Sequence, residues 1–290
     1  MNAKRIGVYA ILLASMMWAL EPVFAKLAFV NSDFIQTSAI RAIVVALIAA
    51  VYVIITNKSR FKVSKKHIPK IIYIAVAGTV VADLLYFFAL TKIPVVNAVL
   101  IGHMQPIFLV ILGYFFLKED KLTKYDYAGI CIMIIAGLLV TTKNLTNLSM
   151  LRLGTTADLL VLIATIAWAT TAIVMRKYLR SVHSGILVFY RFTIAAIAFI
   201  SYLLITSRLV MPNIYQIIVG VVGGVGSILY YEGLKRIKAA QVGALELSTP
   251  FFAVIFGFII LGETVTVMQI IGITLLMVGV YFLSKKESSA

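Results

Sequence analysis

Long apolar stretches separated by short polar segments run from one end of the chain to the other. A membrane-crossing helix needs about 20 mostly apolar residues to traverse the hydrocarbon of a bilayer. Ten stretches have about this length, at residues 6–27, 33–55, 70–90, 95–117, 124–142, 156–177, 184–206, 213–233, 240–261 and 266–284. The pattern therefore predicts an all-α integral membrane protein with ten transmembrane helices. The segments between the stretches are too short to fold as separate domains.

The second half of the chain repeats the first. At an offset of 150 residues, Trp18-Ala19, Lys26 and Arg41 recur as Trp168-Ala169, Arg176 and Arg191. At an offset of 144, Tyr86, Leu90, Pro106, Gly113 and Glu119 recur as Tyr230, Leu234, Pro250, Gly257 and Glu263. Each half carries five predicted spans, and an odd number of crossings forces the second half to run opposite to the first. We therefore expect two inverted five-helix repeats, 1–142 and 156–290, joined by an outer linker at 143–155, as in many secondary transporters.

Composition and charge agree with a membrane protein. The chain is 62% hydrophobic and 13% charged, with a net charge of +15, whereas soluble domains are about 25% charged. With a cytoplasmic N-terminus, 19 Lys and Arg residues fall on the cytoplasmic side and 5 on the outer side, and Arg41 and Arg191 lie within spans. Cytoplasmic loops carry such an excess. The charge therefore predicts orientation, with both termini cytoplasmic in a plasma (inner) membrane, and not a nucleic-acid partner.

Three features together resemble the drug/metabolite transporter (DMT) superfamily, and more narrowly its EamA-type permeases. They are the Trp18-Ala19 step, the Arg of the second span, and the segments Pro106–Glu119 and Pro250–Glu263. The first of these segments departs from the family pattern by having Lys118 where the family usually has Gly. The resemblance implies ten helices, with helices 1–4 and 6–9 around a central cavity and helices 5 and 10 at the periphery. It also implies transport of small metabolites, often amino acids or related compounds and often outward.

Ionisable residues inside the predicted spans are candidate functional groups, because each costs about 2.5–3.5 kcal/mol to insert. The chain has six at depth: Glu21, Arg41, Asp83, His103, Arg191 and Glu246. Counting at about 1.5 Å per residue from the span ends places the first four at a similar depth, roughly 9–12 Å below the outer surface. The same count places Arg191 and Glu246 together in the inner half.

Two interpretations of these groups stay open. One is structural charge pairing, Arg41 with Asp83 or Arg191 with Glu246, which we favour for the arginines because they are equivalent in the repeat. The other is ion or proton coupling by Glu21, Asp83 and Glu246, which align with Thr171, Ser227 and Gly102 and so break the repeat. If one carboxylate uses up Arg41, another remains unpaired, and an unpaired buried carboxylate tends to hold a proton.

Substrate contacts are predicted for the same acids Glu21 and Glu246, for His103, and for aromatic residues of both halves. His103 is the only histidine in a predicted span; it is either a satisfied core residue or a ligand for substrate or proton. Trp18 and Trp168 lie away from the interfacial belts and would face each other by repeat symmetry. They form either a packing contact or an aromatic wall that stacks on substrate or holds a cation. Tyr86 and Tyr230 are a similar pair.

Other motifs limit the chemistry. Glu21-Pro22 is the best candidate for a local opening in a helix, because proline frees a backbone carbonyl. No further histidine or cysteine stands at metal-ligand spacing, and Cys131 is the only cysteine, so neither a metal, a cofactor nor a disulfide within the chain is expected.

The sequence therefore predicts a secondary transporter, and not an enzyme. It would move an amino acid, an amine or a related compound by alternating access, with protons as a candidate coupling ion. No phosphate-binding G-x-x-x-x-G-K-[ST] loop is present, so a solute or proton gradient would supply the energy. A membrane-embedded enzyme or a channel is the alternative.

Overall fold

The computed structural model describes residues 3–56, 61–117, 124–150, 154–179, 181–209, 211–234, 236, 245–246 and 248–284. The elements are α1 (Ala3–Ala28), α2 (Phe34–Thr56), η1 (Lys65–His67), α3 (Ile68–Ala75), η2 (Val76–Asp83), α4 (Leu84–Leu90), α5 (Val95–Gly102), α6 (Gln105–Leu117), α7 (Lys124–Thr142), α8 (Leu145–Ser149), α9 (Thr156–Val174), η3 (Met175–Leu179), α10 (Ser184–Ile205), α11 (Ile214–Leu234), α13 (Ser248–Leu261) and α14 (Val267–Ser284). These residues contain no strand, as predicted. Glu119, Lys118 and residues 240–244 of the ninth predicted span lie outside the described residues.

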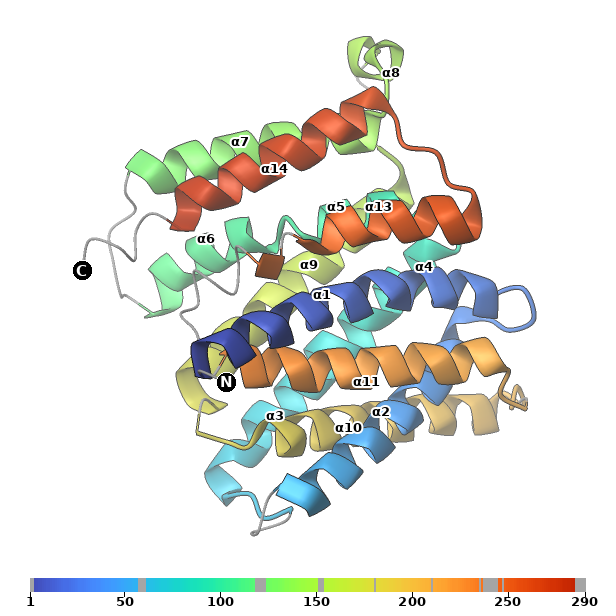
Figure 1. The fold of residues 1–290 in the computed structure, drawn as a ribbon. Coiled ribbons are helices and arrows are strands. Elements are labelled where there is room, and N and C mark those ends of the chain that lie inside the picture. The colour runs from blue at the N-terminus through green and yellow to red at the C-terminus, as the bar shows by residue number, and fades with distance from the viewer. Residues whose placement is uncertain are drawn as a thin grey trace.

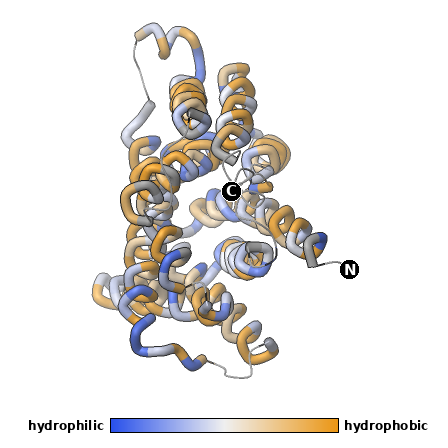
Figure 2. The backbone as a smooth tube through the Cα atoms, turned by 90° about the vertical axis from the view of Figure 1, so that its left-hand side faces the viewer, coloured by the Kyte–Doolittle hydropathy of each residue, from blue (hydrophilic) through white to orange (hydrophobic). Residues whose placement is uncertain are grey.

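Seven helical runs are long and apolar enough to cross a membrane: Arg5–Ala28, Phe34–Thr56, Lys65–Leu90, Val95–Gly113, Thr156–Leu179, Ser184–Ile205 and Ile214–Gly233. Three shorter apolar helices accompany them, at Tyr127–Thr142, Ser248–Leu261 and Val267–Phe282. Large apolar side chains such as Ile55 (77% exposed) and Ile259 (71% exposed) face outward, and hydrophobic positions are spread over the helices throughout the molecule (Figure 2). Such a surface suits lipid and not water.

Helices from the two halves of the chain interleave. α1 packs on α11 and α13, while α9 packs on η2, α4 and α6. α2 packs on α10, α5 on α13, and α7 on α14, which lie side by side at the edge of the bundle (Figure 1). α1 begins and α14 ends at the left-hand end of the bundle in Figure 1; α1 runs away from that end and α9 runs toward it.

The fourth predicted span, at 95–117, is not one continuous helix. α5 ends at Gly102 and α6 begins at Gln105, with His103 and Met104 in a turn between them. Pro106 explains the break, because proline cannot donate to the carbonyl four residues earlier and disfavours helical geometry in the residue before it. By contrast, α1 continues through Pro22, so the opening predicted at Glu21-Pro22 is wrong. The intact bonds on either side carry the helix past the one missing donor.

Glu263 is the centre of a group of polar contacts at the end of the bundle opposite the first residues of α1. Its carboxylate accepts the backbone N–H groups of Val95 (2.9 Å) and Val96 (3.3 Å) at the start of α5. Lys26, near the end of α1, pairs with the same carboxylate at 3.1 Å. A carboxylate at the start of a helix satisfies N–H groups that have no partner within the helix. Glu263 therefore ties α1 and α5, from the first half, to the end of α13.

Candidate functional site

A cavity of about 250 Å³ lies among helices of both halves. All ten residues singled out from the sequence line it: Trp18, Glu21, Arg41, Asp83, Tyr86, His103, Trp168, Arg191, Tyr230 and Glu246. They come from α1, α2, η2, α4, α9, α10 and α11, from the turn after α5, and from the segment just before α13. Ligand sites are concave, mostly apolar and supplied with a few convergent polar groups, and this cavity fits that description.

Arg41 is the centre of an ion-pair network at one side of the cavity. Its Nε donates to a carboxylate oxygen of Glu21 on α1, and its Nη1 donates to Oδ2 of Asp83 at the end of η2, at 2.6 Å. All three side chains are nearly buried. The guanidinium also lies over the rings of Phe87 and Phe192, 5.2 and 5.1 Å from their centroids. The predicted pairing of Arg41 with Asp83 is present, and Arg41 binds Glu21 as well.

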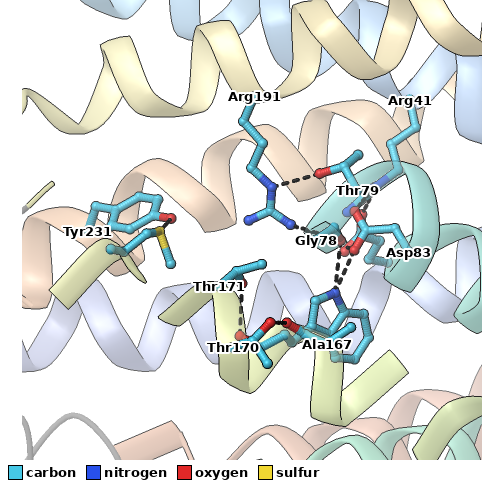
Figure 3. A network of polar contacts seen from close by, with 12 residues as sticks. Arg41, Gly78, Thr79, Asp83, Ala167, Thr170, Thr171, Arg191 and Tyr231 are labelled. Carbon is cyan, nitrogen blue, oxygen red and sulfur yellow. Dashed lines mark hydrogen bonds and ion pairs between the residues drawn. The ribbon is translucent and has the colours of Figure 1, made fainter. Parts of the chain in front are cut away.

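Arg191 belongs to the same network and not to a separate pair (Figure 3). Its Nη2 lies 3.7 Å from Oδ1 of Asp83 and donates to the carbonyl of Gly78 at 3.2 Å. Its Nε donates to Oγ1 of Thr79 at 2.6 Å. Among the described residues, Glu246 forms no ion pair with Arg191, so the predicted inner-half pair is wrong. Counting residues along the spans missed this because long side chains and the packing of α10 on η2 bring Arg191 toward Asp83.

Asp83 is therefore shared by both arginines, and its position depends on an irregular helix. Its Oδ1 also accepts from Nε1 of Trp168 at 2.7 Å, and the same indole N–H lies 3.1 Å from the carbonyl of Gly78. Gly78, Thr79 and Asp83 all lie in η2, which has π-helical geometry. A π-turn leaves some backbone carbonyls without their usual donors and is frequent at functional sites. Here the carbonyl of Gly78 accepts from side chains of the second half.

The aromatic residues form two matching pairs, each joining one half of the chain to the other. Trp18 packs on Tyr230 with ring centroids 4.8 Å apart. Trp168 packs on Tyr86 at 5.3 Å. The sequence predicted that the two tryptophans would face each other; among the described contacts each tryptophan instead meets the tyrosine of the opposite half. The two pairs correspond in the sequence repeat, because Trp18 recurs as Trp168 and Tyr86 as Tyr230.

His103 and Glu246 lie where helices end or begin inside the bundle. His103 follows α5, and its Nδ1 donates to the carbonyl of Val99 at 2.7 Å. This bond engages Nδ1 and leaves Nε2 as the second polar atom of the ring. His103 lines the same cavity as the acids but has no described contact with them. Glu246 precedes α13 and is only partly buried. Its position in the sequence repeat matches that of Gly102, the last residue of α5.

Sequence reasoning missed three contributors. Thr79 and Phe192 contact the arginines but are ordinary residue types in an apolar span. Gly223 of α11 lies against the network, since a Cβ atom there would be 2.5 Å from Oε1 of Glu21 and 3.4 Å from Nε of Arg41. The signal for Gly223 was the internal repeat, because Gly223 occupies in the second half the position that Thr79 holds in the first. Among the described residues, no group of three His, Cys, Asp or Glu side chains is placed to hold a metal ion.

Comparison with known proteins gives consistent relatives. The chain is 30% identical over 220 residues to an uncharacterized transporter of Synechocystis sp., covering 71% of this chain and 62% of that protein. It is 29% identical over 215 residues to an uncharacterized transporter of Methanothermobacter thermautotrophicus, covering 72% and 62%. The matches thus span about three fifths of the length of these relatives. A solved crystal structure, described only as that of a protein, has a TM-score of 0.69 at 15% identity, covering 99% of both chains; at this identity the likeness shows the fold alone.

The family comparison covers nearly the whole chain. The profile of the EamA-like transporter family matches residues 5–142 and again residues 155–285. The two matches coincide with the two halves whose helices surround the cavity. Together with the transporter relatives and the apolar helices, they identify an integral membrane protein of the drug/metabolite transporter type. The chain belongs to the EamA-like transporter family.

Proposed function

We propose that this protein is a secondary transporter that moves a small metabolite, an amino acid, an amine or a related compound, across the membrane by alternating access. The observation that carries the proposal is a cavity lined by acids, arginines and aromatic residues of both halves. Secondary transporters place the substrate at such an interface between repeats, beside helices that are interrupted in the membrane. The break between α5 and α6 at His103 supplies one such interruption.

The moving parts in this proposal are two inverted five-helix repeats, residues 1–142 and 156–290, connected by residues 143–155. The packing pattern supports this division, because the most extensive contacts recur when each helix is exchanged for its repeat partner. α1 on α11 corresponds to α9 on η2 and α4, and α1 on α13 corresponds to α9 on α6. The opposite directions of α1 and α9 in Figure 1 support inversion. α7 and α14, which pair at the edge, would be the peripheral helices.

Orientation and direction complete the proposal. The 19-to-5 excess of Lys and Arg supports cytoplasmic termini in the plasma (inner) membrane. The contacts of Glu263 with Lys26, Val95 and Val96 would then close the outer end of the cavity. This contact must open for substrate to cross the outer end in either direction, so export and import are both to be measured, and export, which the family resemblance implies, is measured first.

We assign substrate contacts to the aromatic pairs, His103 and the acids, and coupling to Glu21, Asp83 and Glu246. Arg41 and Arg191 are the structural cations of the site. Since both arginines contact Asp83 and Arg41 also binds Glu21, the network contains two acids and two cations and is balanced. The unpaired acid expected beside Arg41 is therefore better sought at Glu246, outside the network.

The test is transport by purified protein in proteoliposomes, first with substrates found by a thermal-shift screen of amino acids, amines, sugars and organic acids. Bound ligand stabilises the folded state by mass action. The proposal expects saturable uptake, exchange of labelled for unlabelled substrate, and stimulation by a pH gradient. Glu246→Gln is expected to remove the pH dependence of transport and to weaken exchange, because Glu246 also contacts the substrate in this proposal. Flux that does not saturate and shows no exchange would indicate a channel and overturn the proposal.

A further inference from the structure

Glu246 differs from the other two acids of the cavity, because no described residue compensates the charge of its carboxylate. It lines the cavity and is only partly buried. Among the described residues, none forms an ion pair or a hydrogen bond with its carboxylate. The two arginines of the cavity are engaged elsewhere: Arg41 by Glu21 and Asp83, and Arg191 by Asp83 and Thr79. A carboxylate at depth in a membrane protein needs a partner, and in transporters such residues mark substrate or ion pathways.

The surroundings of Glu246 suit a positive charge. It lines the same cavity as Tyr230 and Trp18, and these two rings pack against each other with centroids 4.8 Å apart. The indole is held in place by Gly226, where a Cβ atom would be 3.1 Å from the ring. Faces of tryptophan and tyrosine attract ammonium groups, and the attraction grows when water is excluded. A carboxylate that shares a cavity with two such rings can bind an organic cation.

The charges of the cavity determine which substrate balances them. With all three carboxylates ionised, as they would be once a proton has left for the substrate, Glu21, Asp83 and Glu246 give three negative charges and Arg41 and Arg191 two positive charges; His103, whose Nδ1 is bonded to the backbone, is counted as neutral. The sum is one negative charge. A monocation brings this sum to zero, an amino-acid zwitterion leaves it at minus one, and a carboxylate anion makes it minus two. Uncompensated charge in a low dielectric is costly.

We propose that the substrate is an organic monocation without a carboxylate, a small amine whose ammonium group pairs with Glu246 beside the Trp18–Tyr230 rings. This inference rests on the proposed transport function and narrows it from amino acids, amines and related compounds to one class. The apolar part of the amine would face the remaining aromatic pair, Trp168 and Tyr86, across the cavity. The balanced network around Arg41 would then be the fixed frame of the site and not the part that binds the charge.

A series of probes on one carbon skeleton tests the assignment. Calorimetric titration of the purified full chain would compare phenethylamine, phenylalanine methyl ester, phenylalanine and 3-phenylpropionate. We expect the two monocations to bind at least tenfold more tightly than the zwitterion, and the anion not to bind. Glu246→Gln should weaken phenethylamine binding about 30-fold or more, the usual loss when one partner of a buried charge pair is truncated. Glu246→Asp should recover part of that loss.

Thr193→Val provides the control. Thr193 lies in α10 and is not among the described residues that line the cavity. Its hydroxyl is buried without a hydrogen-bond partner among the described residues, so valine removes no described hydrogen bond and should leave the affinity within about twofold of wild type. The assignment is overturned if phenylalanine binds as tightly as phenethylamine, or if Glu246→Gln changes amine affinity no more than Thr193→Val does. Uptake of the same probes into proteoliposomes tests the transport function separately from the substrate class. An amine that binds through Glu246 but is never moved refutes transport alone, whereas transport of phenylalanine without the amine refutes the substrate class alone.

Discussion

Replacing Arg41 with leucine should destabilise the protein much more than the same change at its repeat equivalent, Arg191. Arg41 binds two nearly buried carboxylates, those of Glu21 and Asp83. Without it Glu21 has no ion-pair partner among the described residues, and Asp83 keeps only Arg191 at 3.7 Å. Removing one partner of a buried ion pair costs about 3–5 kcal/mol, because the other charge stays behind in a low dielectric. We expect Arg41→Leu to lower the free energy of unfolding by about this amount.

The loss at Arg191 should be smaller, about 1–2 kcal/mol, because its hydrogen bonds go to the uncharged acceptors Thr79 and the carbonyl of Gly78 and its ion pair with Asp83 is long, at 3.7 Å. Its nearest carboxylate, Asp83, keeps the 2.6 Å hydrogen bond from Arg41. Although the two arginines occupy equivalent positions in the repeat, the asymmetric placement of the acids makes their contributions unequal. The difference of about 2 kcal/mol follows from which carboxylates each cation touches.

Reversible unfolding in mixed micelles, titrated with sodium dodecyl sulfate, measures these free energies. A second substitution checks the cause: Glu21→Gln, introduced into the Arg41→Leu protein, removes the stranded charge and should recover about 1–3 kcal/mol. In the wild-type background the same Glu21→Gln change should destabilise. Equal losses for Arg41→Leu and Arg191→Leu, or a double variant less stable than Arg41→Leu alone, would refute the reasoning.

Two further predictions concern packing and topology. Gly223→Ala should lower the free energy of unfolding by about 1–3 kcal/mol, because the added Cβ would lie 2.5 Å from Oε1 of Glu21. Gly113→Ala should have no such cost, because no atom lies within 4 Å of a Cβ there. Equal effects of the two changes in a thermal-shift assay would contradict the contact. In a Cys131→Ala background, Ser64→Cys should react with a membrane-impermeant maleimide only after the cytoplasmic side is exposed, and labelling of intact cells would reverse the proposed orientation.

Much of the fold follows from the sequence because membranes impose simple rules. A segment of about 20 apolar residues must cross as a helix, since its backbone groups find no partners in lipid. The helical class, the apolar segments and the list of cavity residues could therefore be read from the order and duplication of residues. Helix continuity could not. Pro22 and Pro106 look alike in sequence, yet α1 continues through the first while the chain breaks just before the second.

The sequence by itself determined which side chains carry a free-energy cost of insertion into a membrane, and hence that Glu21, Asp83 and Glu246 needed partners or a function. Only the tertiary structure decided which partner each received. Depth along a span fixes one coordinate of a side chain, but pairing depends on helix rotation and on the reach of long side chains across interfaces. Arg191 therefore joins Asp83, through the π-helical turn of η2, and Glu246 is left facing the cavity beside Tyr230. The repeat placed the two arginines at equivalent positions, and the packing decided which carboxylates each of them reaches.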